Sequence, residues 1–165
     1  MRRAARGVAI RRASERDLDV VTALRLALLR EHRTSPVYGR LRPDVGTRAR
    51  RLYLAQLRSP NEVTLLAERA GEVVGILRCI QSTGHPLLLP PVYGYVSSVY
   101  VRPEARRTGV LRALVDAAVA WCRERELPEL RLHNAADSAV SNAAWDALGF
   151  AVVEHLRLRP LPEQG

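Results

Sequence analysis

The spacing of apolar residues changes along the chain, and each spacing predicts a particular element. The first clear run has apolar residues every three or four positions, which predicts one face of an amphipathic helix: Leu18, Val21, Leu24 and Leu28. Ser14 stands before this run and Asp17 follows three residues later, a pair typical of a capped helix start. We therefore expect a helix that begins after Ser14 and ends near His32.

A second helix is predicted beyond a loop. Residues 34–46 contain two prolines and two glycines, a composition that favours a loop. Helical spacing then returns at four positions: Ala49, Leu52, Tyr53 and Leu57. This second helix should end near Ser59, because Pro60 follows it.

Six stretches have the composition of strands. They are rich in β-branched, aliphatic and aromatic residues: Val8–Arg11, Val63–Glu68, Val73–Gln81, Val92–Val101, Glu129–His133 and Phe150–Arg159. A short turn over residues 69–72 should join the second and third of them as a hairpin. Residues 82–91 contain three prolines and one glycine, so an irregular loop is expected there.

The strongest helical pattern runs from about Gly109 to Glu126, where Pro128 then stops it. A shorter helix is predicted over Ser138–Leu148. The elements therefore follow in the order strand, helix, helix, three strands, helix, strand, helix, strand, which predicts a mixed α/β fold without repeats. Residues 1–165 are expected to form one domain with its core at about 8–159, and the tail from Pro160 is expected to be disordered.

Composition excludes several classes of protein. No apolar run approaches the ~18 residues of a membrane span, and the arginine-containing amino terminus lacks the apolar region of a secretory signal. The two cysteines, Cys79 and Cys122, have no zinc-site spacing, so no metal is expected. Two buried thiols in a reducing cytoplasm are favoured over a disulfide.

The charge of +9 and the sequence pI near 10.8 raise the question of nucleic-acid binding. All 26 basic residues are arginine, however, and they are scattered through every kind of element. This usage is typical of the coding bias of GC-rich bacteria, and no basic run is interleaved with aromatic residues for base stacking. We therefore expect no nucleic-acid partner, although a basic surface favours anionic ligands such as a phosphorylated cofactor.

A phosphate site is predicted where the fourth strand leads into the long helix. The connecting residues read R-R-T-G-V-L from Arg106 to Leu111, and they match neither a Walker A loop nor GxGxxG. A single glycine there could merely relieve a tight turn. The flanking arginines and the free amino terminus of the helix instead favour a phosphate or pyrophosphate.

This region resembles the signature of the Gcn5-related N-acetyltransferase (GNAT) family, a strand ending near V-x-P followed by [RQ]-x-x-G-x-[GA] and a helix. Here it reads V-Y-V-R-P-E-A-R-R-T-G-V-L-R-A-L, with Arg106 and Gly109 on the first two motif positions and Leu111 where a second small residue is usual. S-A-V-S-N-A-A-W-D-A-L-G-F is similar to the family's later motif. The resemblance covers about residues 8–159 and implies the GNAT-like acyl-CoA N-acyltransferase fold.

The resemblance also implies roles for individual residues. Acetyl-CoA would be the cosubstrate, with its pantetheine arm along the fourth strand and its pyrophosphate at the turn. The implied cofactor-binding residues are Val99, Tyr100, Val101, Arg106, Arg107, Thr108, Gly109, Val110, Leu111, Arg112, Ser141 and Trp145. The backbone N–H of Val99 would also stabilise the oxyanion that forms when an amine attacks the thioester directly.

The two proton-transfer positions of the family hold unusual residues. Tyr95 stands where a glutamate is frequent, and no carboxylate lies between Val92 and Arg102. Tyr95 could relay a proton through water or simply pack at the rim of the core. Trp145 stands where a tyrosine usually protonates the leaving thiolate, and its indole N–H does not titrate. It could pack against the cofactor or fill the core.

Two functions therefore remain open. One is an N-acetyltransferase for a small-molecule or exposed primary amine, and the other is a GNAT-fold module that binds acyl-CoA without transferring the acyl group. The expected location is the bacterial cytoplasm, with no membrane partner. Dimers are common in the family, so the resemblance also allows a homodimer through the last strand. The acceptor amine cannot be read from the sequence.

Overall fold

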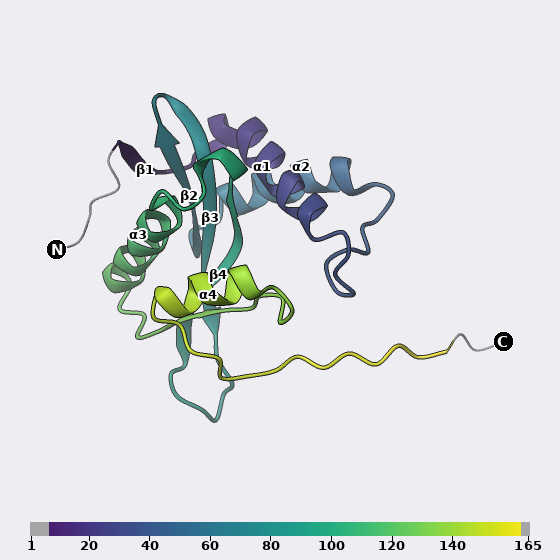
Figure 1. Cartoon of the computed structure of the whole chain (residues 1–165). Coiled ribbons are helices and arrows are strands. Elements are labelled where there is room, and N and C mark those ends of the chain that lie inside the picture. Colours follow the sequence, from purple (N-terminus) through teal and green to yellow (C-terminus); the bar gives the residue numbers. More distant parts are fainter. Residues whose placement is uncertain (1–6, 163–165) are drawn as a thin grey trace. The chain divides into compact units, whose positions relative to one another are not determined.

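The computed structural model describes residues 7–162 (Figure 1), and the expectations about residues 1–6 and 163–165 lie outside this range. The chain divides after His133 into two compact units, which are treated separately below. The larger unit carries the sheet and three of the α-helices, and the smaller one carries the fourth. The expectation of one domain stays a prediction.

The larger unit is built on one mixed sheet of five strands in the order β1-β2-β3-β4-β5. Its strands are Val8–Arg12 (β1), Glu62–Arg69 (β2), Glu72–Thr83 (β3), Val92–Val101 (β4) and Leu130–Leu132 (β5). Neighbours from β1 to β4 run antiparallel, whereas β4 and β5 run parallel. This arrangement confirms the predicted mixed α/β class, and it places β4 between an antiparallel and a parallel neighbour.

Helices cover both faces of this sheet (Figure 1). The helices are α1 (Leu18–Glu31), α2 (Val45–Leu57) and α3 (Val110–Glu124). Ile76 of β3 belongs to the core under α1 and α2, whereas a side chain at Gly75 would meet α3. Because successive strand residues point to opposite faces, α1 and α2 cover one face and α3 covers the other. We call the first of these the α1/α2 face.

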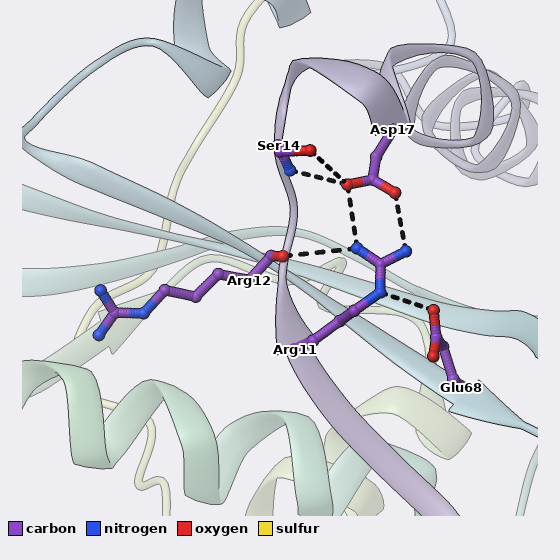
Figure 2. Close-up of polar contacts among 5 residues, drawn as sticks. All are labelled: Arg11, Arg12, Ser14, Asp17 and Glu68. Carbon is purple, nitrogen blue, oxygen red and sulfur yellow. Dashed lines mark hydrogen bonds and ion pairs between the residues drawn. The ribbon is translucent and has the colours of Figure 1, made fainter.

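The predicted helix start at Ser14 is confirmed. The backbone N–H of Ser14 donates to the Asp17 carboxylate at 2.7 Å, across a short 3-10 turn at Glu15–Asp17. Arg11 of β1 grips the same carboxylate with two nitrogens, at 2.7 and 2.9 Å, and its third nitrogen donates to Glu68 of β2 (Figure 2). One arginine therefore ties the end of β1 to the start of α1 and to the neighbouring strand.

The two thiols also lie as predicted. Cys79 of β3 and Cys122 of α3 are free and buried, and their Sγ atoms are 3.8 Å apart. The contact with Cys122, together with burial, raises the pKa of the Cys79 thiol. In residues 7–162 no helix is both long and apolar enough to cross a membrane.

The smaller unit contains α4 (Ala139–Ala147) followed by residues without secondary structure. The predicted strand Phe150–Arg159 is therefore wrong: residues 151–162 form no strand, and their side chains are exposed. Alternating apolar residues show that a segment can pair, but a strand also needs a neighbour whose backbone accepts its hydrogen bonds. No such neighbour is found among the described residues.

Candidate active site

The fourth strand is interrupted by a β-bulge. Ile76 of β3 pairs with Tyr100, but Arg78, two residues later, pairs with Ser97, three residues earlier on β4. Ser98 and Val99 therefore stand opposite Leu77 alone, and Ser98 has a left-handed φ of 53°. A bulge of this kind leaves backbone groups unpaired in the sheet ladder and bends the strand. The amide of Val99, the predicted oxyanion donor, lies in this bulge.

The edge of β4 beyond the bulge is open on the side of β5. The parallel pairing with β5 involves only Gly94–Val96 of β4, and within the described residues it does not extend to Ser97–Val101. Backbone groups of Val99, Tyr100 and Val101 on this side can therefore accept an extended ligand, as an added strand would pair. These are the residues predicted to hold the pantetheine arm.

The predicted phosphate turn follows directly. Pro103–Ala105 forms a 3-10 turn, and two left-handed residues come next, Arg107 with φ 61° and Gly109 with φ 89°. Gly109 is the residue before α3, and its carbonyl accepts the first helical hydrogen bond, from Ala113 at 3.0 Å. The N–H groups of the first helical turn have no carbonyl partner inside a helix. The amides of Val110 and Leu111 are therefore suited to an anion, and the predicted anion site stays a prediction.

Arg106 is already engaged on the protein itself. Its Nε donates to the carbonyl of Val101 at 2.9 Å, and its guanidinium forms an ion pair with Glu31 at the end of α1. The guanidinium also lies over the ring of Tyr100, 5.7 Å from its centroid. Arg106 thus fixes the turn to β4 and α1, so its contribution to an anion site comes through the position of the backbone.

Two residues that support the turn carry no signal in the sequence. Arg69, at the end of β2, donates to the hydroxyl of Thr108, which in turn donates to the carbonyl of Ala105 at 2.6 Å. Gly75 leaves room for α3, because a Cβ there would lie 3.0 Å from Cγ1 of Val110. The hairpin β2–β3 therefore sets the position of the turn, a long-range contact that spacing along the chain does not reveal.

Tyr95 and His133 form a hydrogen-bonded pair beside the bulge. Tyr95 of β4 stands in register with Arg131 of β5, and the residue after β5 is His133. The Tyr95 hydroxyl lies 2.8 Å from Nδ1 of His133, and the two rings are tilted at 5.7 Å. Burial, followed by the proximity of Tyr38 and Tyr93, raises the pKa of Tyr95, so its hydroxyl keeps its proton at neutral pH. Tyr95 alone is therefore no base.

Charged groups lie buried on the α1/α2 face of the same sheet. Arg78, opposite Ser97 of β4, forms an ion pair with Glu62 in which the two side chains are only 14% and 9% exposed. Arg25 of α1 stacks on the ring of Tyr53, with its guanidinium carbon 3.7 Å from the ring centroid. Burial lowers the pKa of Arg25 to about 10. The α1/α2 face of the sheet beside the bulge therefore carries charged side chains as well as aliphatic ones.

The smaller unit holds the remaining predicted residues. The side chain of Ser138 caps α4 by accepting the N–H of Ser141 at 3.3 Å. Trp145 packs edge-on against Phe150, with ring centroids 5.4 Å apart. A role of Ser141 or Trp145 at the cofactor stays a prediction. Within the described part of the chain, no three His, Cys, Asp or Glu side chains cluster in a way that could hold a metal ion.

Comparison with known proteins identifies relatives of this arrangement. The model of the acetyltransferase (GNAT) family matches residues 25–150. Aminoglycoside N(6')-acetyltransferase type 1 from Acinetobacter haemolyticus is 33% identical over 61 residues, which are 37% of this chain and 42% of that protein. The same type of protein from Acinetobacter baumannii is 31% identical over 62 residues, 38% of this chain and 42% of that protein. These matches thus span less than half of the length of the curated relatives.

Solved structures match over nearly the whole chain. A predicted acetyltransferase with acetyl-CoA from Clostridium acetobutylicum is 19% identical, with a TM-score of 0.76 over 92% of this chain and 96% of that one. Aminoglycoside 6'-N-acetyltransferase AAC(6')-Ih from Acinetobacter baumannii is 21% identical, with a TM-score of 0.76 over 96% of this chain and 100% of that one. At these identities the likeness establishes the fold.

Proposed function

Since the chain belongs to the acetyltransferase (GNAT) family, we propose that it transfers an acetyl group from acetyl-CoA to a primary amine. The observation that carries the proposal is the pairing of the β4 bulge at Ser98 with the left-handed turn at Gly109, which together provide one strand edge and one helix amino terminus. Acetyl-CoA has an extended pantetheine arm, which a strand edge can bind, and a pyrophosphate, which a helix amino terminus can bind.

The residues of the chain fit acetyl-CoA. The open edge at Val99–Val101 suits the amide groups of the pantetheine arm, and the amides of residues 107–112 suit the pyrophosphate. Leu111 occupies a position usually held by a small residue, but its backbone N–H belongs to the first turn of α3 and remains suited to donate. A cofactor role for Ser141 and Trp145 belongs to the same proposal.

The chemistry we propose is direct attack of a neutral amine on the thioester carbonyl. The N–H of Val99 in the bulge would donate to the oxyanion of the tetrahedral adduct. The two cysteines are unsuited to an acyl-enzyme route, since both are buried and the pKa of Cys79 is raised. The chain itself therefore supplies geometry and hydrogen bonds, and acetyl-CoA supplies the activated acyl group.

A small molecule with a primary amine is the acceptor that the relatives favour, because the matched Acinetobacter proteins are aminoglycoside N(6')-acetyltransferases. The acceptor would lie against the α1/α2 face, near Tyr95 and the loop between α1 and α2. We place the protein in the bacterial cytoplasm, in keeping with its free thiols and with the organisms of these relatives.

A second candidate is an acyl-CoA-binding module without transfer activity. The observation that favours it is the absence of a carboxylate from β4, where Tyr95 stands instead. Both candidates predict cofactor binding, so binding alone does not separate them.

Two measurements on the full chain decide between the candidates. Acetyl-CoA at millimolar concentration should raise the melting temperature, because a ligand that binds only the native state stabilises it. Release of free thiol from acetyl-CoA is then followed with a panel of amines that includes aminoglycosides, polyamines and amino-terminal peptides. Amine-dependent release supports the enzyme, and a melting shift without release supports the module. Absence of the shift in melting temperature would contradict both candidate functions.

A further inference from the structure

The contact between Tyr95 and His133 links two strands at the point where they separate. The paired segment of β4 and β5 ends at Val96 and Leu132, so Tyr95 and His133 lie at the last place where the strands still face each other. Their 2.8 Å hydrogen bond joins the position of the missing carboxylate to an imidazole. Nothing in the spacing of the sequence pairs these two residues, which are 38 positions apart.

The Tyr95 hydroxyl donates in this hydrogen bond when Nδ1 of His133 carries no proton. Burial and the nearby hydroxyls of Tyr38 and Tyr93 hold the tyrosine in its protonated form. A protonated hydroxyl can donate to Nδ1 while its oxygen lone pairs stay available to another donor. The oxygen of Tyr95 can therefore accept a proton from one side as it releases its own on the other.

We propose that Tyr95 and His133 form a two-residue proton relay, in which the Tyr95 oxygen takes a proton from the acceptor amine as the Tyr95 proton passes to Nδ1 of His133. This inference rests on the proposed acetyltransferase function and names the base that β4 lacks. Tyr95 touches the reacting nitrogen, and His133 acts through it as a positioning and proton-accepting residue.

The step balances as follows. The amine lone pair forms the C–N bond at the thioester carbonyl, and the carbonyl π electrons move to oxygen. The adduct nitrogen, now positively charged, gives one proton to Tyr95, whose own proton moves to His133 and makes an imidazolium. When the C=O bond forms again, the C–S bond breaks and the CoA thiolate leaves with the electron pair. The thiolate takes a proton from water, and the imidazolium returns its proton to solvent.

Other charged groups on the same face are already paired. Arg131, which stands in register with Tyr95, lies over the ring of Tyr93 at 3.9 Å and forms an ion pair with Glu129 at 2.6 Å. From the α1–α2 loop, Tyr38 approaches Tyr95. On the same α1/α2 face, Arg78 forms an ion pair with Glu62, and Arg25 lies over the ring of Tyr53.

The test compares kcat/KM from pH 5 to 9 for the wild type, Tyr95→Phe, His133→Gln and the double variant, with an amine that the wild type acetylates. Each single variant should lose about 10²-fold, the lower end expected for general-base catalysis. The double variant should lose no more than either single variant, because the two groups act as one unit. After division by the fraction of neutral amine at each pH, the remaining fall of the wild-type kcat/KM toward acidic pH should disappear in both single variants.

Two controls show whether such losses come from the relay. His155→Gln removes an imidazole elsewhere in the chain and should keep the wild-type rate. All variants should keep the acetyl-CoA melting shift, which excludes misfolding. Nitrogen NMR of His133 gives a readout without turnover: neutral His133 should carry its proton on Nε2, and Tyr95→Phe should change that distribution.

The relay is overturned if kcat/KM of His133→Gln stays within about 3-fold of the wild-type value and, after the same division by neutral amine, still falls toward acidic pH. It is equally overturned if the losses of the two single variants multiply in the double variant. It is also overturned if Tyr95→Phe leaves the His133 nitrogens unchanged. A wild type that releases no thiol with any amine contradicts the proposed function itself, and the relay falls with it. The two failures are therefore distinguishable.

Discussion

Asp17 holds the junction between β1 and α1 through hydrogen bonds from Ser14 and Arg11. Its carboxylate accepts from the Ser14 backbone and from two nitrogens of Arg11, and Arg11 in turn reaches Glu68 (Figure 2). The hydrogen bond from Arg11 is the main reason that the pKa of Asp17 is lowered to about 2. The Asp17 side chain is 13% exposed, so water screens these contacts only partly.

This lowered pKa predicts how stability depends on pH. A carboxyl whose pKa is lower in the folded than in the unfolded chain stabilises the fold above its ordinary pKa near 3.8, and the effect is lost as pH falls toward 2. Asp17→Asn should therefore reduce the free energy of unfolding at pH 7 by about 1–2 kcal/mol. Urea titrations between pH 7 and pH 2 measure the effect.

A matched control is available two residues later, in the first turn of α1. Asp19 is 86% exposed and pairs with Arg50 at the surface, so Asp19→Asn should change the free energy of unfolding by less than about 1 kcal/mol at pH 7. If Asp17→Asn proved as stable as Asp19→Asn at every pH, the Arg11 contacts would contribute nothing measurable to the fold.

Tyr95 shows which features of the candidate site could be predicted from the sequence and which could not. The resemblance to the GNAT family implied that it stands in the place of a base, because the family motif aligns it with a frequent glutamate. The sequence could not show that His133 lies beside it, because that contact depends on the parallel pairing of β4 with β5. Nor could it show that Ser98 adopts a left-handed φ, since two serines in a strand carry no bulge signal.

At the scale of elements, the close approach of α3 to β3 depends on one glycine. A Cβ at Gly75 would lie 3.0 Å from Cγ1 of Val110 and 3.2 Å from Cδ1 of Leu114. Val110 is the first residue of α3, so any shift forced there moves the amides that face the proposed pyrophosphate. The packing of two elements is thus coupled to the cofactor site.

Gly75→Ala should therefore reduce the free energy of unfolding by about 1–3 kcal/mol, as overpacking of a core does. It should also weaken acetyl-CoA binding, which isothermal calorimetry measures. Gly46→Ala serves as the control, because a Cβ at Gly46 meets no atom within 4 Å. Combining Gly75→Ala with Val110→Ala should lose less stability than the sum of the two single losses; strict additivity would show that the two residues do not compete for space.

The elements differ in how well the sequence predicts them. The segment from Val92 to Glu124 was predictable because a strand, a proline, a glycine and a helical apolar face follow one another locally. The predicted strand at Phe150–Arg159 failed because alternation shows only that a segment can pair. The support of the turn by Arg69 and Gly75 was invisible for a similar reason, since both act across the sheet.

At the scale of the whole molecule, the net charge of +9 is what remains after 26 arginines are set against 17 carboxylates, and several arginines of the larger unit pair with carboxylates, for example Arg12 with Glu124 and Arg58 with Glu15. The expectation of no nucleic-acid partner stays a prediction, and the excess of positive charge favours a polyanionic cofactor. Binding of acetyl-CoA at the β4 bulge and the amino terminus of α3 is the claim on which the proposed activity and the relay both depend.

An NMR titration of the full chain with acetyl-CoA tests this claim most directly. The largest amide shifts should fall on Val99–Val101 and on Gly109–Arg112, and Gly109→Asp should abolish them by placing a negative side chain on a residue with φ 89° beside the pyrophosphate. Absence of shifts at millimolar acetyl-CoA, or shifts confined to other parts of the chain, would contradict the proposed site.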